Sequence, residues 1–438
     1  MDRRRSAAKG RRHKWRADPG VAAGARAGKS VKVVSAPVAV LKFGGTSLAS
    51  AQSREMAALR VREAAAGGLL PVVVCSAMGR SPEPYATDSL LSLLAEDNRR
   101  SANTDLLIAS GELISAALFA ELLCARDLPA RALTGAQAGI LTDNTYGDAK
   151  IVRVEPSAVR TLLDRGVIPV VAGFQGMSPR GEITTLGRGG SDLSAIALGN
   201  ALNAQRIDIY TDVSGAMSAE PARVGGARTI ERAQLLEMSE LAEHGAKIMH
   251  QKAADFARAT RTPYAIKSLQ TDRGTLVSEE VDHLRPVTGV TSTSGMTFVR
   301  IIRGDIADPQ ARMQLELQMF KRMAEESISL DQVNINQAGV FFVVKHQHGE
   351  RIRAMLADLN MAVRMREECS KISIVGAGMR GTPGVIYQIV EALSSENIEV
   401  IHCTDSNITI SVLVPDAGAA RAEEAIHRHF RLHEGEPA

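Results

Sequence analysis

The chain has 438 residues, which is enough for two or three domains of ~100–250 residues each. Its composition, with 45% hydrophobic and 23% charged residues, is that of a globular protein. No run of apolar residues approaches the ~18 needed to cross a bilayer, and the 4 cysteines form no CxxC pair. These features argue against a membrane protein, a disulfide framework and a zinc site, so we expect a cytoplasmic protein.

The net charge of +3 is unevenly distributed along the chain. Residues 1–37 carry 11 Lys/Arg and 2 acidic residues, so the remainder, with 41 basic and 47 acidic residues, is mildly acidic. A basic arm of this kind can bind nucleic acid or act as a transit peptide. The rest of the chain does not interleave aromatic with basic residues, which argues against nucleic-acid binding. We therefore interpret residues 1–37 as a disordered basic extension.

Strands and helices alternate through the next part of the chain. Strand-like apolar runs occur at Val38–Leu41, Pro71–Cys75, Ile168–Ala172 and Ile207–Tyr210, and the domain ends near Gly274–Val277. Helical patterns lie near 50–66, 104–126, 154–164, 191–203 and 231–243. This alternation predicts an α/β domain over residues 38–280, in which a largely parallel sheet lies between two layers of helices.

The pattern changes after a short polar link that contains Pro286. Two shorter units follow, at residues 287–365 and 368–434, and each has the order strand, helix, strand. The predicted elements are Thr297–Ile302, 311–325 and Val340–Val344 in the first unit, and Ile372–Val375, 383–395 and Ile408–Val414 in the second. This approximate repeat predicts two small βαββαβ domains.

Two glycine motifs imitate nucleotide-binding signatures. Gly24–Ser30 (GARAGKS) is one residue short of a P-loop, and no strand precedes it. Gly376–Gly381 (GAGMRG) fits GxGxxG after a strand-like run, but too few residues follow it to complete a dinucleotide-binding fold. We therefore assign the second motif to a small sensor domain.

Two other glycine loops are better candidates for a phosphate site. Lys42–Ser47 (KFGGTS) ends the first strand, where bare backbone can approach phosphate and Lys42 supplies a positive charge. Thr184–Asp192 (TTLGRGGSD) leads into a helix whose N-terminus favours anions, with Ser191 or Asp192 as the expected N-cap. Arg188 in that loop can grip a carboxylate with two hydrogen bonds.

Other polar residues carry weaker signals when taken alone. Glu112 begins an otherwise apolar helix, where an exposed glutamate of the first turn is common. Ser76 follows an apolar strand, and Thr87 and Asp88 precede a leucine-rich helix. Lys247 lies in HGAKIMH, where a solvated lysine is the ordinary interpretation.

Taken together, these segments resemble the aspartate kinases of the amino acid kinase family. The matching motifs are KFGGTS (42–47), VVVCSAMG (72–79), SGE (110–112), TTLGRGGSD (184–192), IYTDVSG (209–215) and HGAKIMH (244–250). The resemblance covers residues 38–434 and implies a three-layer kinase domain followed by two ferredoxin-like ACT domains. It also implies ATP-dependent phosphorylation of the aspartate side-chain carboxylate, the first step toward lysine and diaminopimelate, threonine and methionine.

The resemblance further implies a role for each matching residue. Lys42 and Lys247 would hold the ATP phosphates and stabilise the transferring group, and Asp192 would orient Lys42. Arg188 would bind the α-carboxylate of aspartate and Glu112 its ammonium group. The remaining substrate contacts would come from Ser76, Thr87 and Ser191, and the remaining nucleotide contacts from Gly44, Gly45, Thr46, Ser47, Thr211, Asp212, Met217 and Arg223. Mg²⁺ would accompany ATP without a dedicated cluster of protein ligands, and no general base is needed because a carboxylate is already a nucleophile.

The predicted ACT domains imply feedback control by lysine, threonine or diaminopimelate and assembly into at least a homodimer. The expected effector-binding residues are Asn334, Asn336 and Gln337 in the first domain and Asp405, Ser406 and Asn407 in the second. The polar residues of the first domain have an equally plain structural interpretation, in which they satisfy loop backbone.

The nucleotide segment departs from the family pattern. Where the family usually reads TDVDG and then TADPR, this chain has TDVSG (211–215) and SAEPAR (218–223), so Ala222 replaces the phosphate-side arginine and Arg223 follows it. Gln251 replaces a proline that is common after His250. Two alternatives to an active aspartate kinase therefore stay open: a paralogue that acts as an amino-acid sensor, and another carboxylate kinase such as a glutamate kinase.

Overall fold

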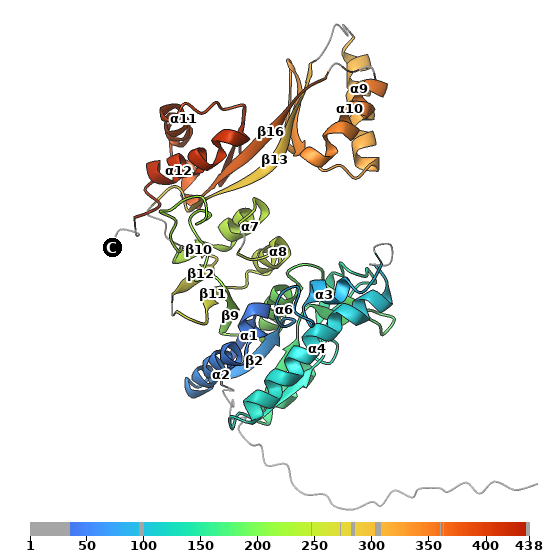
Figure 1. Cartoon of the computed structure of the whole chain (residues 1–438), viewed down its shortest axis with the longest axis vertical. Coiled ribbons are helices and arrows are strands. Elements are labelled where there is room, and N and C mark those ends of the chain that lie inside the picture. Colours follow the sequence, from blue (N-terminus) through green and yellow to red (C-terminus); the bar gives the residue numbers. More distant parts are fainter. Residues whose placement is uncertain are drawn as a thin grey trace, which may run out of the picture. The chain divides into compact units, whose positions relative to one another are not determined.

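The computed structural model describes residues 36–95, 100–246, 248–271, 273–281, 285–302, 308–359, 361 and 363–434 (Figure 1). The predicted basic extension lies outside the described residues except for Ala36 and Pro37. Lys247 and the P-loop-like segment 24–30 also lie outside them.

An eight-stranded sheet forms the centre of the first domain. Its strand order is β10-β12-β11-β9-β1-β2-β6-β3, and neighbouring strands are parallel except for the pair β11 and β12. The strands are β1 (Val38–Phe43), β2 (Leu70–Cys75), β3 (Ala130–Leu133), β6 (Ile168–Ala172), β9 (Arg206–Thr211), β10 (Arg232–Gln234), β11 (Tyr264–Ser268) and β12 (Gly274–Ser278). The predicted largely parallel sheet is therefore confirmed.

Helices cover both faces of this sheet, which confirms the three layers (Figure 1). On one face lie α2 (Ala51–Ala66) and α4 (Ala102–Cys124), and on the other α5 (Ser157–Asp164), α6 (Gly190–Leu202), α7 (Leu235–Glu243) and α8 (Gln251–Ala259). Side chains of a strand alternate between the faces. In β1, Leu41 and Phe43 therefore pack toward α2 and α4, whereas Val40 packs toward α6.

Two of the predicted helices begin later than the sequence pattern indicated. Pro156 stands at the N-cap of α5, so the predicted start at residue 154 was wrong and the helix begins at Ser157. The predicted helix 231–243 begins at Leu235 because residues 232–234 pair with β12 as an edge strand. A capping box between Gln234 and Glu237 fixes that start.

A small second sheet, which the sequence reading missed, carries one of the glycine loops. Its order is β5-β4-β7-β8, and its strands are β4 (Ile140–Thr142), β5 (Ile151–Val154), β7 (Gln175–Met177) and β8 (Ile183–Thr185). Strand β8 feeds directly into the loop 186–189 before α6. Two short helices, α1 (Gly45–Ala49) and α3 (Thr87–Leu91), complete this edge of the domain.

Helix α4 is long and apolar enough to cross a membrane by length and composition alone. Half of its most apolar stretch is buried inside the protein, where Ala116, Phe119 and Leu123 pack against the sheet. This is the packing of a core helix.

The C-terminal region is built on a six-stranded sheet of order β14-β15-β13-β16-β18-β17. Its strands are β13 (Gly289–Ile302), β14 (Asp331–Asn336), β15 (Gly339–Lys345), β16 (Val363–Val375), β17 (His402–Asp405) and β18 (Thr409–Pro415). Its helices are α9 (Pro309–Glu325), α10 (Gly349–Asp358), α11 (Val385–Ser395) and α12 (Ala419–His429). Residues of α9 and α10 pack on one half of the sheet and residues of α11 and α12 on the other, as the two predicted ferredoxin-like units require.

The two long strands β13 and β16 belong to both halves. They pair with each other from Gly289–Val375 to Ile301–Val363, with irregular register near Met296. The second half gains its fourth strand from Gly289–Thr293, which precedes the first half in sequence. The predicted boundary between 365 and 368 therefore falls inside β16, and the residue limits of the two units stay a prediction.

The six-stranded sheet folds back on itself. Gln332 of β14 donates its side-chain amide to the Ser411 carbonyl of β18 at 3.2 Å, although these strands lie far apart in the strand order. The rings of Phe298 in β13 and His402 in β17 contact each other in a tilted arrangement, with centroids 5.3 Å apart. A small apolar cluster of Met296, Val343, Cys369 and Leu413 lies between the halves.

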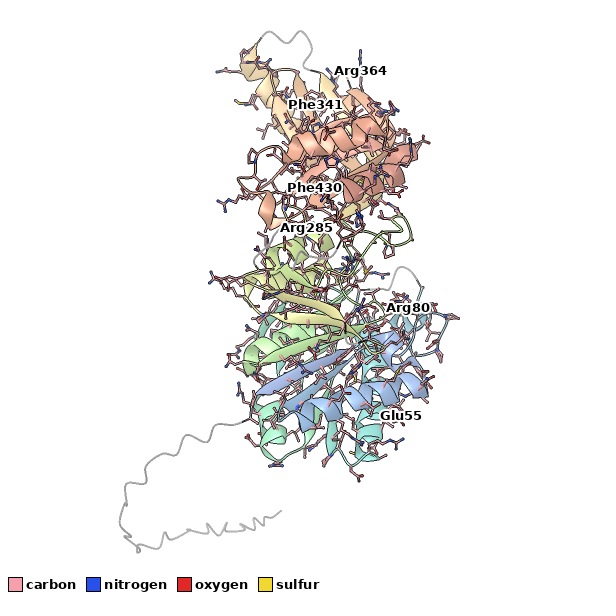
Figure 2. All side chains as sticks on the ribbon, turned by 90° about the vertical axis from the view of Figure 1, so that its left-hand side faces the viewer. Glu55, Arg80, Arg285, Phe341, Arg364 and Phe430 are labelled. Carbon is pink, nitrogen blue, oxygen red and sulfur yellow. The ribbon has the colours of Figure 1, made fainter. Side chains whose placement is uncertain are left out.

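The GAGMRG motif serves packing. A Cβ atom on Gly376 would lie 2.2 Å from the Pro286 carbonyl oxygen, and one on Gly378 would lie 2.6 Å from the Arg285 carbonyl oxygen. Arg285, labelled in Figure 2, also donates to the carbonyl groups of Arg431 and Glu434 at 2.5 and 2.8 Å. The glycines thus let the segment after residue 284 pass close to the second ACT-like unit.

We expect Gly376→Ala to lower the free energy of unfolding by roughly 1–3 kcal/mol, because the added methyl group meets backbone that cannot move aside. The measurement is chemical or thermal unfolding. Gly225→Ala is the matched control, because a Cβ atom there meets nothing within 4 Å. Equal stabilities for both variants would contradict this packing role.

Candidate active site

The polar residues of the site gather at the carboxyl ends of parallel strands, where open α/β sheets bind ligands. Lys42 points from β1 toward α6, and its ammonium lies 2.6 Å from a carboxylate oxygen of Asp192. The two side chains are only 8% and 14% exposed. A buried ion pair of this kind holds each charge in one place, because either partner alone would pay a large desolvation cost.

The glycine loop before α6 owes its shape to close packing. Gly187 and Gly189 have left-handed backbone, with φ of 75° and 73°. A Cβ atom on Gly189 would lie 2.1 Å from the Cβ atom of His250, so only glycine fits there. Gly189 is also the N-cap of α6. The prediction that Ser191 or Asp192 caps this helix was therefore wrong; both lie in its first turn and project from it.

One cavity gathers six of the predicted residues. Its lining includes Gly45, Ser76, Thr87, Glu112, Arg188 and Ser191, together with Asp88, Gly147 and Phe174. The hydroxyl oxygens of Ser76 and Ser191 are 2.7 Å apart, which joins the loop after β2 to the start of α6. Segments far apart in sequence thus form one small polar chamber.

Glu112 does not begin a helix, as the sequence reading supposed. It lies in the middle of α4 and is only 3% exposed. The backbone N–H of Ala77 donates to one of its carboxylate oxygens at 3.1 Å, while the other oxygen is buried without a hydrogen-bond partner. Burial raises the pKa of Glu112 to about 8, against the opposing effects of the Ala77 N–H and of Lys42. A buried carboxylate with an unpartnered oxygen can accept a hydrogen bond from a cationic ligand group.

Arg188 and His250 stand near the mouth of the glycine loop. The Arg188 side chain is 84% exposed, and its guanidinium lies 4.0 Å from a carboxylate oxygen of Asp88. Burial lowers the pKa of His250, which the nearby Asp192 carboxylate opposes and Arg188 reinforces. Arg188 is therefore a long cationic side chain with its guanidinium largely in water, at the edge of the cavity.

Several supporting residues were missed by the sequence reading. Asp105 of α4 is fully buried and accepts hydrogen bonds from Gly147 and Thr185. Phe174 lines the cavity with a left-handed φ of 66°, and its N–H donates to the Ser194 hydroxyl at 3.0 Å. An acid in an apolar helix, two turns before Glu112, was the available signal for Asp105.

The predicted nucleotide residues lie on the β9 side of Lys42. The N–H of Gly44 donates to the Tyr210 carbonyl at 3.1 Å, so KFGGTS runs beside the end of β9, where Thr211 and Asp212 follow. Thr46 and Ser47 lie in α1. Arg80 (Figure 2) pairs with Asp212 at 2.6 Å. Met217 and Arg223 are further along the chain and line a separate cavity with Gly215, Pro221, Ile248 and Val290.

Arg223 is engaged by the C-terminal region. Its guanidinium donates to the Ser292 hydroxyl of β13 and lies 3.7 Å from the Glu423 carboxylate of α12. Glu423 is fully buried and also accepts from Ser292 at 2.7 Å and from the Glu220 N–H at 3.3 Å. The loop that departs from the family pattern is therefore attached to α12.

The predicted effector residues behave differently in the two units. Asp405, Ser406 and Asn407 line a cavity with Arg380, Thr382 and Tyr387. Asn334 and Asn336 instead bond to each other at 2.9 Å, and Asn336 also accepts the N–H of Ala338. Gln337, in the same turn, is exposed. The first-unit residues thus satisfy their own turn.

Comparison with known proteins agrees with these features. A profile of the amino acid kinase family matches residues 37–268, and a profile of the ACT domain matches residues 372–430. Aspartokinase 1 of Bacillus subtilis is 38% identical over 405 residues, which cover 90% of this chain and 99% of the relative. The chain belongs to the aspartokinases of the amino acid kinase family.

Other aspartokinases extend the likeness. The Corynebacterium glutamicum enzyme is 36% identical, with 90% of this chain and 96% of the relative covered. A crystal structure of E. coli aspartokinase III in complex with aspartate and ADP is 25% identical, with a TM-score of 0.71 and coverage of 90% and 99% of the two chains. The family and fold predicted from the motifs are confirmed. The individual site residues stay predictions.

Asp192→Asn should reduce aspartokinase turnover by about 100-fold or more, because Lys42 loses the partner that fixes its ammonium. Removing one partner of a buried pair should also cost about 3–5 kcal/mol of stability. Steady-state kinetics and thermal unfolding measure both effects. Glu55→Gln is the control, because it breaks an exposed pair with Arg126 (Glu55 is labelled in Figure 2). Unchanged turnover in Asp192→Asn would remove Asp192 from the site.

Proposed function

We propose that this aspartokinase binds L-aspartate in the cavity between α4 and the glycine loop and phosphorylates its side-chain carboxylate with ATP. The observation that carries the proposal is that an acidic and a basic side chain, Glu112 and Arg188, line the same cavity. Glu112 offers a buried oxygen without a partner, suited to an ammonium group, and Arg188 offers a guanidinium suited to a carboxylate. A zwitterionic acid supplies both groups, and E. coli aspartokinase III has been crystallised with aspartate and ADP.

The chemistry requires positioning and charge neutralisation more than proton transfer. A carboxylate oxygen of aspartate attacks the γ-phosphorus, the bond from that phosphorus to the β,γ-bridging oxygen breaks, and ADP leaves with the electron pair. The nucleophile is already ionised near neutral pH, so no general base is needed. Lys42, held by Asp192, would neutralise charge on the phosphoryl oxygens. Lys247 would contribute a second charge.

Mg²⁺ is expected to accompany ATP. Among the described residues, no group of three His, Cys, Asp or Glu side chains is arranged as a metal site. Mg²⁺ commonly keeps several water ligands and takes others from phosphate, so it needs only one or two protein carboxylates. Asp192 and Asp212 are the candidates. The ion would offset the negative charge of the phosphate groups.

A second candidate function is an amino-acid sensor with weakened nucleotide binding. The observation that favours it is the contact of Arg223 with Ser292 and Glu423. Ala222 stands where the family has an arginine, and these contacts turn Arg223, the adjacent candidate to replace it, away from the nucleotide. The buried Lys42–Asp192 pair favours the active enzyme, because a sensor would not need a desolvated charge at the phosphate position.

Feedback control would act through the second ACT-like cavity at Asp405, Ser406 and Asn407. Lysine, threonine and diaminopimelate are the candidate effectors, as products of the pathways to which phospho-aspartate would be committed. A homodimer or larger assembly is part of the proposal. Exposed apolar side chains of α9, Met313 and Leu317, at 61% and 60%, support association through the regulatory region. The cytoplasm is the expected compartment.

Mg-ATP with L-aspartate should give aspartate-dependent release of ADP, and L-glutamate should not replace aspartate. One of lysine, threonine and diaminopimelate should suppress the release. Asp405→Asn should weaken that suppression by about tenfold while leaving basal turnover unchanged, since a charged contact to an amino acid is worth ~1.5–3 kcal/mol. Nucleotide binding without turnover would favour the sensor, and undiminished suppression in Asp405→Asn would exclude this effector site.

The KM for aspartate should depend on pH through Glu112. Its pKa of about 8 means that the free site is mostly protonated near pH 7, whereas an ammonium ligand requires the carboxylate. Binding therefore releases a proton, and KM should fall by about 15-fold in all as pH rises from 6.5 to 8, then level off. Kinetics at fixed saturating ATP measure this slope. Glu112→Gln should raise KM and flatten the profile; an unchanged profile in that variant would exclude Glu112 as the titrating group.

A further inference from the structure

Asp105 is a buried carboxylate that accepts hydrogen bonds from Gly147, which lines the aspartate cavity, and from Thr185, which lies two residues before the glycine loop of that cavity. It is 0% exposed. The Gly147 N–H donates to both of its oxygens at 3.0 and 3.1 Å, the Thr185 N–H donates at 2.7 Å, and the Thr185 hydroxyl donates at 3.0 Å. One side chain therefore accepts from three donors in two segments that do not adjoin in sequence, the loop at Gly147 and the end of β8 at Thr185.

Both loops border the place proposed for aspartate. Thr185 ends β8 and leads directly to Gly187 and Arg188, and Gly147 lines the cavity itself. The two loops also bind each other, because the Ala149 N–H donates to the Thr185 carbonyl at 2.9 Å. Lys252 of α8 pairs with Asp148 from the outer side. Asp105 is the inner anchor of this arrangement.

The helix that carries Asp105 also carries Glu112. Asp105, Ile108 and Glu112 are spaced by three and four residues, so they lie along one stripe of α4. Ile108 and Glu112 line the cavity, and Glu112 accepts the N–H of Ala77 from the loop after β2. One rigid helix face thus fixes the opposing walls: the Ser76–Ala77 loop through Glu112, and the Arg188 loop through Asp105.

We propose that Asp105 is a positioning residue for aspartate, which sets the distance between the Arg188 loop and Glu112 without contacting substrate. The inference rests on the proposed aspartate site. A zwitterion held at both ends requires its two partners at a fixed separation, so a loop displaced by a fraction of an ångström weakens the grip on aspartate. Nucleotide binding, on the β9 side of Lys42, should be little affected.

Asp105→Asn should raise the KM for aspartate by about ten- to a hundredfold, because the NH2 group that replaces one carboxylate oxygen cannot accept from the Gly147 N–H or from the Thr185 hydroxyl. The KM for ATP should change by less than about threefold. Thr185→Val removes only the hydroxyl donor, so it should raise the KM for aspartate by a smaller factor in the same direction, and it provides the test if Asp105→Asn does not fold. Steady-state kinetics with each substrate varied, together with thermal unfolding, supply the readouts.

Glu237→Gln is the matched control. Glu237 is also 0% exposed and accepts from donors of the same kinds, two backbone N–H groups and one threonine hydroxyl. These are the N–H groups of Gln234 and Ala377 at 2.8 Å and the Thr288 hydroxyl at 2.6 Å. It does not line the aspartate cavity. Its loss should lower thermal stability in a comparable way while leaving the KM for aspartate unchanged.

The outcomes separate this inference from the proposed site. A higher KM for aspartate in Asp105→Asn and Thr185→Val, but not in Glu237→Gln, supports the positioning role. If Asp105→Asn changes only stability, or if Glu237→Gln raises the KM equally, Asp105 is merely structural and the inference fails. If Glu112→Gln itself leaves the KM unchanged, the proposed aspartate site is wrong, whatever Asp105 does.

Discussion

The buried ion pair between Lys42 and Asp192 is the constraint on which the catalytic edge depends. An ammonium that is 8% exposed is tolerated only with a counter-charge at contact distance, so β1 and the first turn of α6 must meet there. The first turn of α6 is in turn placed by Gly189, where His250 leaves no room for a side chain. A buried charge on β1 thus constrains where α6 begins.

Helix α4 uses two buried carboxylates in opposite ways. Asp105 has its hydrogen bonds supplied by protein donors, so it can hold two loops in place. Glu112 has one oxygen without a partner, and burial therefore raises its pKa to about 8. The carboxylate of Asp105 has its hydrogen bonds satisfied within the protein, whereas Glu112 keeps one unsatisfied oxygen, which a ligand with a positive charge would satisfy. Both residues lie on one stripe of α4, so the hydrogen bonds of Asp105 help to hold the wall opposite Glu112 in place.

The kinase domain and the regulatory region are joined by direct contacts. The loop after β9 is attached to α12, where Ser218 and His427 are 2.8 Å apart and Arg223 reaches Glu423. Burial lowers the pKa of His427 to about 4, with a smaller contribution from His433, so this contact joins neutral groups near pH 7. The strands β13 and β16 belong to both halves of the regulatory sheet, so continuous backbone hydrogen bonding joins the two halves. The altered residues 214–223 therefore lie where the kinase domain meets the regulatory region.

The sequence by itself determined the family, the parallel three-layer domain and the chemical character of the site. Those features depend on short-range patterns: apolar alternation, glycine spacing and the KFGGTS and TTLGRGGSD motifs. Only the tertiary structure decided that Glu112 is buried in mid-helix, that Gly189 caps α6, that Arg223 faces the regulatory region and that Asp105 binds two cavity loops. Burial and hydrogen-bond partners come from segments distant in sequence, and no local pattern records them. The sequence analysis did not predict that β13 and β16 belong to both halves of the regulatory sheet. The reason is the same, because the sequence of a strand does not specify which other strand it pairs with.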